Sequence, residues 1–73
     1  MTEYGVVLFY TTSSAMRAEK LLSRAGYAVK LIPVPRQFSS DCGIALRFDW
    51  HQNEQVRSAL DKAHVEIDSV HCL

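Results

Sequence analysis

Residues 4–10, Tyr-Gly-Val-Val-Leu-Phe-Tyr, form a nearly all-apolar run that is rich in β-branched and aromatic side chains and has polar flanks. Such a run is typical of a strand that is buried on both faces at the centre of a sheet. The chain has 73 residues, which allows one domain with a thin core. We therefore expect residues 1–73 to form a single domain around this strand.

The segment that follows predicts a helix. Residues 11–14, Thr-Thr-Ser-Ser, supply several candidate N-caps. Apolar residues then recur at helical spacing until Gly26, which is well placed to end the helix. These apolar positions are Ala15, Ala18, Leu21, Leu22 and Ala25. A second apolar stripe, formed by Val56, Ala59, Leu60 and Ala63, predicts a second helix.

Three further segments are predicted to be strands: residues 28–32, which end at Pro33, residues 44–48, and the weaker, partly alternating residues 65–70. The order βαββαβ indicates an α+β fold, a ferredoxin-like sandwich of a four-stranded antiparallel sheet with two helices on one face. In this topology the third strand lies between the first and second and runs antiparallel to both.

Overall charge and composition exclude several classes of function. Eight basic and eight acidic residues cancel, which argues against a nucleic-acid binder that relies on bulk charge. There is no apolar run long enough to span a membrane and no basic leader before the first strand. Two cysteines without a Cys-x-x-Cys pair do not make a disulfide scaffold. The expectation is a cytoplasmic protein with reduced thiols.

Cys42 is the leading candidate for a reactive centre. It lies in a turn-rich loop directly before the third predicted strand. The topology places it beside the ends of the first two strands, near the start of the first helix. A helix N-terminus or a nearby cation lowers the pKa of a thiol and makes it nucleophilic, whereas an adjacent carboxylate such as Asp41 opposes this. An inert, partly buried cysteine is the competing interpretation.

Several neighbours have the chemistry to form a pocket around this thiol. Arg36 offers a cation, hydroxyl groups offer hydrogen-bond donors, and Gly43 leaves room for a bound group. The hydroxyl candidates are Thr12, Ser13 and Ser14 at the predicted helix start, and Ser39 and Ser40 in the loop itself.

The sequence from residue 31 to residue 43, with Pro-Val-Pro-Arg followed by Ser-Ser-Asp-Cys-Gly, resembles the selenium/sulfur carrier-like family. Phe9, Ser14, Ala18-Glu19, Leu22, Gly26 and Ala45-Leu46 contribute to the same pattern. The resemblance covers residues 4–48. Small bacterial single-domain proteins make up this family, and similar domains occur beside sulfur-carrier domains in proteins linked to selenium metabolism.

The resemblance implies that Cys42 carries a persulfide or perselenide, with Arg36 and the serines shaping its pocket. Sulfur or selenium bound to Cys42 would be the only covalent group, and no separate cofactor or metal is expected. A cysteine desulfurase is the expected class of donor, and a selenophosphate synthetase or a sulfurtransferase is the expected class of acceptor. Such a protein is a carrier more than a turnover enzyme.

Two other functions compete with the carrier hypothesis. One is a regulatory or interaction module with an inert Cys42, which pairs through the open face of its sheet as a homodimer or with another protein. The other is a thiol redox protein in which Cys42 forms a sulfenate or a mixed disulfide. Cys72 is expected at the opposite end of the sheet, roughly 20 Å away for strands of this length, so it is not a predicted disulfide partner.

The remaining polar residues suggest weaker sites. His51, His64, His71 and Cys72 have no recognisable zinc spacing. Arg17, Lys20 and Arg24 follow one stripe of the first predicted helix. Such a stripe is typical of a solvated face, and its functional alternative is a docking surface for an acidic partner.

Overall fold

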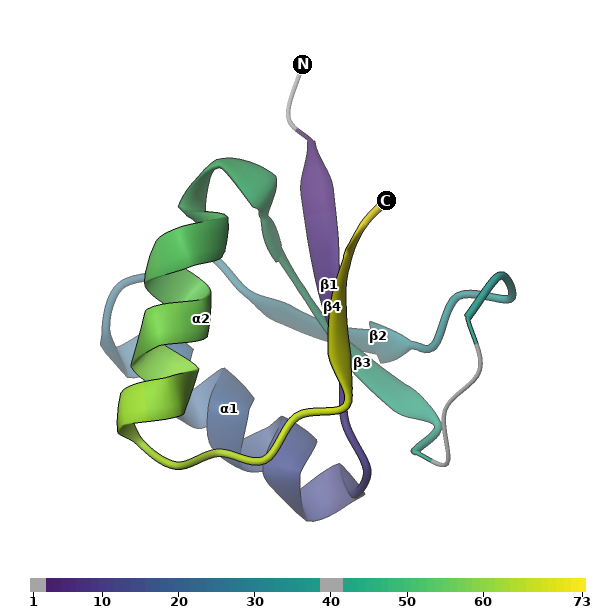
Figure 1. Ribbon diagram of the computed structural model, residues 1–73, viewed down its shortest axis with the longest axis horizontal. Helices are drawn as coiled ribbons and strands as arrows, with labels where there is room; N and C mark the ends of the chain where they lie inside the picture. Colours follow the sequence, from purple (N-terminus) through teal and green to yellow (C-terminus); the bar gives the residue numbers. More distant parts are fainter. Residues whose placement is uncertain (1–2, 39–41) are drawn as a thin grey trace.

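The computed structural model describes residues 3–38 and 42–73. The elements follow one another as β1 (Tyr4–Leu8), α1 (Thr12–Arg24), β2 (Lys30–Pro33), β3 (Ile44–Asp49), a 3₁₀ turn (Trp50–Gln52), α2 (Asn53–Lys62) and β4 (Ser69–Cys72). The strands form one antiparallel sheet in the order β2-β3-β1-β4. Both helices lie on the same side of this sheet (Figure 1). The predicted ferredoxin-like α+β fold is confirmed, with β3 between β1 and β2.

The first helix begins and ends where its sequence dictates. The Thr11 side chain caps α1 by accepting a hydrogen bond from the backbone N–H of Ser14 at 3.1 Å. At the other end Gly26 adopts a φ of +95°, which only glycine reaches without strain. The turn that carries the hydroxyl candidates is therefore fixed at the end of β1.

The helix-side core is built on the alternate residues of the strands that point toward the helices. Val7, Phe9, Leu46 and Phe48 from the sheet are buried there. The helices contribute the apolar positions that their spacing predicts, with Ala15, Ala18, Leu22, Val56 and Leu60 buried. Gly5 matters for this packing because a Cβ there would lie 2.5 Å from the ring of Trp50.

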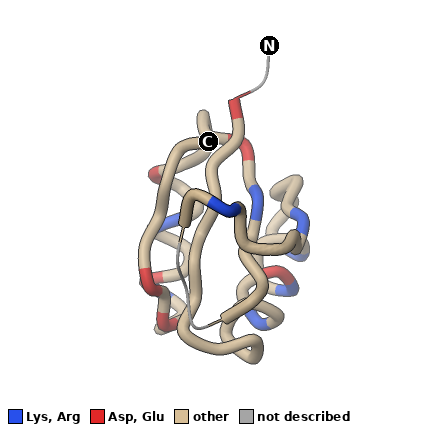
Figure 2. The backbone as a smooth tube through the Cα atoms, turned by 90° about the vertical axis from the view of Figure 1, so that its right-hand side faces the viewer, with Lys and Arg blue, Asp and Glu red and all other residues tan. Residues whose placement is uncertain are grey.

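The opposite face of the sheet is not open. Val6, Leu8 and Ala45 are buried on this face, and Val34 and Phe38 from the connection between β2 and β3 pack against them. The Phe38 ring stacks on His71 of β4, with 4.3 Å between ring centroids. Figure 2 looks onto this side and shows the connection in front of the strands. The expectation of an open face available for pairing is wrong over the centre of the sheet, because the chain covers it with its own apolar side chains.

Strand boundaries differ from the sequence prediction mainly in β4. Residues 65–70 were predicted as a strand, but the ladder comprises Ser69–Cys72. The backbone N–H of Val65 still bonds to the carbonyl of Leu60 at the end of α2. Pairing starts only when the N–H of Asp68 reaches the carbonyl of Leu8 at 2.7 Å.

Candidate functional site

Cys42 lies directly before β3, at the end of the sheet where β1 and β2 also end. Ala45 is paired with Leu8, and Ile44 is paired with Pro33. Because α1 starts a few residues after Leu8, its first turn lies at the same end. This is the position that the sheet topology predicts for the thiol.

The sulfur of Cys42 has two polar neighbours among the described residues. Its Sγ lies 3.8 Å from the hydroxyl oxygen of Thr12, the first residue of α1, and either atom can be the donor. Its thiol also donates a hydrogen bond to the carbonyl of Ile44 at 3.4 Å. The sequence points to Thr12 as a neighbour of the thiol, but nothing in the sequence identifies the Ile44 carbonyl.

Cys42 is buried, with 4% of its surface exposed. A turn-rich loop suggests a thiol at the mouth of the domain, yet this side chain is enclosed. The surroundings of the sulfur include the first turn of α1, whose Thr12 hydroxyl lies 3.8 Å away, and the start of β3, whose Ile44 carbonyl accepts its hydrogen bond.

The other two hydroxyl candidates of the helix start do not reach the sulfur in the same way. Ser13 is exposed. The hydroxyl of Ser14 accepts a hydrogen bond from the hydroxyl of Thr11 at 3.0 Å. Of the three residues Thr12, Ser13 and Ser14, the structure thus records a hydrogen-bond contact with Cys42 for Thr12.

Loop candidates divide into two groups. Ser39 and Ser40 lie outside the described residues. Arg36 is exposed on the turn that the N–H of Phe38 closes by bonding to the carbonyl of Pro35. Within the described part of the chain, no ion pair or hydrogen bond joins Arg36 to Cys42. The cationic neighbour that the sequence suggests is therefore not in contact with the thiol in this structure.

Gly43 leaves open space next to the thiol. It is exposed, and a Cβ added to it would meet no heavy atom within 4 Å. It also lines an apolar hollow of about 290 Å³ together with Leu31, Ile32, Pro33 and Ile44. Reasoning from the sequence missed this hollow, although the position of β2 at the edge of the predicted sheet was a signal that its outer side stays uncovered.

Cys72 lies at the opposite end of the sheet. It is exposed and paired with Gly5 at the start of β1. Both cysteines are reduced. The neighbouring His71 points to the face covered by Phe38, and its Nε2 lies 2.9 Å from the hydroxyl of Ser69. Across residues 3–38 and 42–73, no three His, Cys, Asp or Glu side chains gather closely enough to hold a metal ion.

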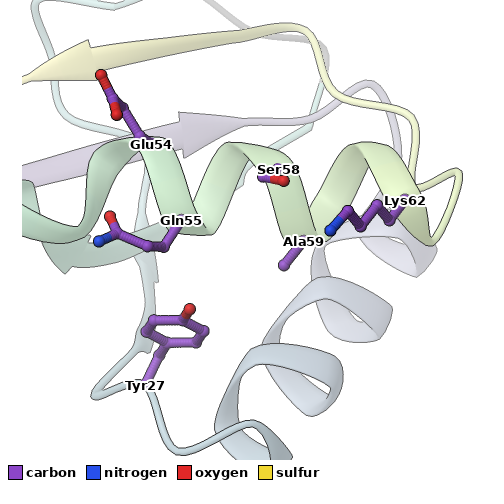
Figure 3. A pocket seen from close by; sticks show the side chains of 6 residues that line it. All are labelled: Tyr27, Glu54, Gln55, Ser58, Ala59 and Lys62. Carbon is purple, nitrogen blue, oxygen red and sulfur yellow. The ribbon is translucent and has the colours of Figure 1, made fainter.

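A larger hollow of about 470 Å³ lies on the helix side of the molecule. Figure 3 shows Tyr27, from the connection between α1 and β2, facing side chains of α2. Its lining consists of Tyr27, Glu54, Gln55, Ser58, Ala59 and Lys62. No residue from the segments around Cys42 contributes to it, so it is separate from the thiol site.

Comparison with known protein families gives a match that covers residues 4–72. The matching family is described as "Putative Se/S carrier protein-like". The chain belongs to this family. The match extends through α2 and β4, well past residues 4–48, on which the resemblance in the sequence rests. Neither a curated protein nor a solved structure matches the chain. None of the helices in the described residues has the length and apolar character needed to cross a membrane.

Proposed function

We propose that Cys42 carries sulfur or selenium as a persulfide or perselenide and passes it from a donor to an acceptor enzyme. Membership of the Se/S carrier-like family supports the type of cargo. The observation that carries the assignment to Cys42 is the 3.8 Å contact between its Sγ and the Thr12 hydroxyl at the first turn of α1. The other cysteine, Cys72, is exposed, and its thiol donates to the carbonyl of the adjacent Leu73.

This contact suits a sulfur atom that changes its charge during the reaction. As a neutral thiol, Cys42 donates to the Ile44 carbonyl. As a thiolate, it can accept the hydroxyl hydrogen of Thr12. Because the thiolate is the nucleophile, the Thr12 hydroxyl is a hydrogen-bonding group beside the reacting atom.

The transfer conserves electrons and needs no external oxidant. The Cys42 thiolate attacks the terminal sulfur of a donor persulfide, a new S–S bond forms on Cys42, and the donor leaves as a thiolate. A nucleophile of the acceptor then attacks the same terminal atom, and the Cys42 thiolate is released. A terminal selenium atom follows the same two steps.

Access to the buried sulfur is proposed from the side of Gly43. Since a Cβ at this position meets nothing within 4 Å, a donor can approach the backbone next to Cys42 closely. The roles that the family resemblance implies for Arg36, Ser39 and Ser40 stay predictions, because Ser39 and Ser40 lie outside the described residues and Arg36 is exposed.

The test is sulfur loading followed by intact-mass measurement. The protein is incubated with a cysteine desulfurase and cysteine, and separately with selenocysteine. A mass gain of one sulfur or selenium atom is expected in the wild type and in Cys72→Ala, and none in Cys42→Ala. An equal gain in Cys42→Ala would assign the loading to another position and refute the proposal.

A second candidate function is a regulatory or interaction module in which Cys42 is structural. Its 4% exposure and its hydrogen bond to Ile44 favour this alternative. Alkylation separates the two candidates in a Cys72→Ser background. A structural Cys42 reacts with iodoacetamide only as fast as the protein opens, whereas a carrier thiol that a donor can reach reacts in the native state, faster than the protein opens.

A further inference from the structure

The two edges of the sheet differ in charge. The segment from α1 to β2 carries Arg17, Lys20, Arg24 and Lys30 and a single carboxylate, Glu19. The segment from α2 to β4 carries Glu54, Asp61, Glu66 and Asp68 against Arg57 and Lys62. Figure 2 shows this separation, with the cations mostly on one flank of the tube and the carboxylates mostly on the other.

On the basic flank, β2 is an edge strand next to two adjoining hollows. It pairs with β3 and with no other strand among the described residues. The apolar hollow of Leu31, Ile32, Pro33, Gly43 and Ile44 lies on one side. A second hollow of about 320 Å³ lies between β2 and α1 and is lined by Met16, Arg17, Glu19, Lys20 and Leu31. Leu31 lines both hollows, so they adjoin at this residue.

The backbone of β2 can extend the sheet over a short length. The N–H of Val34 bonds to Gly43, so it points toward β3. Since strand residues alternate in direction, Leu31 presents its N–H and C=O to the outside. Pro33 has no N–H, which ends the ladder there and protects the edge from longer pairing.

We propose that the β2 edge and the neighbouring face of α1 form the docking surface for the sulfur or selenium donor, and that they bind an extended acidic segment of that protein. This inference deepens the proposed function and rests on it. Apolar side chains of the segment would fill the hollow beside β2, while its carboxylates face Lys20, which lines the hollow between α1 and β2, and Arg24, one turn further along the same helix. The far end of the segment passes Gly43, the residue next to Cys42.

The chemistry of the surface favours a protein segment over other occupants. The lining of the hollow beside β2 is aliphatic, without the aromatic rings on which nucleic-acid bases stack. A second copy of the chain offers an acidic edge at β4, but a contact between β2 of one copy and β4 of the next is head-to-tail and leaves both outer edges unpaired. A separate protein that docks on β2 covers this edge in a single binding step.

Binding is tested without any sulfur chemistry. The probe is the peptide acetyl-Glu-Val-Glu-Ile-Glu-Val-amide, titrated into the isotope-labelled protein and followed by amide chemical shifts. The control ligand is the same peptide with each glutamate replaced by lysine. Shifts are expected at Leu31, Gly43 and Lys20. The variant Lys20→Glu/Arg24→Glu should weaken binding roughly tenfold, and Arg57→Glu/Lys62→Glu on α2 should leave it within about twofold.

The two variants are matched because each reverses two exposed cations and each removes one from the last turn of its helix. Arg17 is left intact because its guanidinium donates a hydrogen bond to the Ala63 carbonyl at 2.9 Å. Circular dichroism confirms that both variants are folded. Peptide shifts confined to β4, or equal weakening in both variants, would overturn the proposal. Self-association in sedimentation that only Lys20→Glu/Arg24→Glu abolishes would assign the surface to a second copy.

Rates of sulfur loading from two different donors then test whether docking on this surface serves transfer. Lys20→Glu/Arg24→Glu should slow loading from a persulfide-loaded cysteine desulfurase and leave loading from glutathione persulfide unchanged. If both donors are slowed equally, the surface does not act by docking. If neither donor loads the wild type, the carrier function fails, while the peptide titration still decides whether the surface binds acidic segments.

Discussion

At one end of the sheet Cys42 is enclosed, with its sulfur between the Thr12 hydroxyl and the Ile44 carbonyl. At the other end Cys72 lies exposed on the edge strand, and its thiol donates to the adjacent Leu73 carbonyl, at 3.7 Å. The residue type is the same, but the burial and the hydrogen-bond contacts of the two sulfur atoms differ. Reactivity is therefore expected to follow these surroundings and not simple exposure.

The glycines at the two ends of the sheet differ in packing. Here the glycine at the Cys72 end is tightly packed and the glycine at the Cys42 end is not. Gly5 is packed under the rings of Trp50 and Phe48, whose atoms lie 2.5 and 2.6 Å from the position of a Cβ. Gly43 faces open space. One end is thus filled by aromatic packing, and the other keeps room beside a thiol. The comparison indicates that the first end stabilises the fold and that the second is available for chemistry.

The largest expected effect is on loading. Cys42→Ala should abolish the gain of sulfur or selenium, whereas Cys72→Ala should keep it at the wild-type level. Intact-mass measurement after incubation with a desulfurase checks both. Loading at Cys72 alone would reverse the comparison between the two ends.

Glycine substitutions test the same comparison between the two ends through the free energy of unfolding. Gly5→Ala should lower the free energy of unfolding by about 1–3 kcal/mol, because the added methyl group overpacks the buried ring of Phe48 and the partly buried ring of Trp50. Gly43→Ala should leave it unchanged or raise it by up to about 1 kcal/mol, because the site is open and alanine restricts the unfolded chain. Urea unfolding measures both, and equal losses would show that the Gly43 end is packed as tightly as the other.

The capping residue of α1 is expected to affect stability and not transfer. Thr11→Ala removes the hydroxyl that accepts from the N–H of Ser14, so the free energy of unfolding should fall by about 1 kcal/mol. Loading of Cys42, normalised to folded protein, should stay near the wild-type rate. A loss of loading larger than the loss of folded protein would place Thr11 in the site.

The adjacent Thr12 should show the reverse pattern. Thr12→Val keeps the shape and removes the hydroxyl beside the sulfur, so stability should change little. Alkylation of Cys42 in the Cys72→Ser background should slow by roughly fivefold, the equivalent of one hydrogen bond of about 1 kcal/mol. Thr12→Ser, which restores a hydroxyl, serves as the control, and an unchanged rate in Thr12→Val would remove this residue from the mechanism.

Local patterns in the sequence predict most of the fold. The apolar run around Val6 and Val7, the cap at Thr11 and the stop at Gly26 each act through neighbours in the chain, so they can be recognised without a structure. The position of β4 cannot, because Val65 and Ile67 alternate as a strand would and yet pack as an unpaired connection. Hydrogen bonding to Leu8, a residue distant in sequence, decides where the ladder begins.

The site was predictable to a smaller extent. Strand order alone brings Cys42 to the start of α1, and this part of the site follows from topology. Its burial depends on contacts with segments distant in sequence, such as that with Thr12 of α1, which no short motif encodes. The covered face of the sheet was missed for the same reason, because it depends on a contact between residues distant in sequence. The Phe38 ring stacks on His71, a residue of the edge strand β4.

The start of β1 and the end of β4 lie away from Cys42. The N–H of Leu73 bonds to the carbonyl of Tyr4 at 2.8 Å, and Figure 1 shows the start of β1 and the end of β4 at the same end of the sheet. A fluorescent label, an affinity tag or a whole second domain joined at either terminus would therefore leave the thiol unobstructed. The same closeness makes the chain suited to circular permutation, in which the old termini are linked and new ones are opened elsewhere.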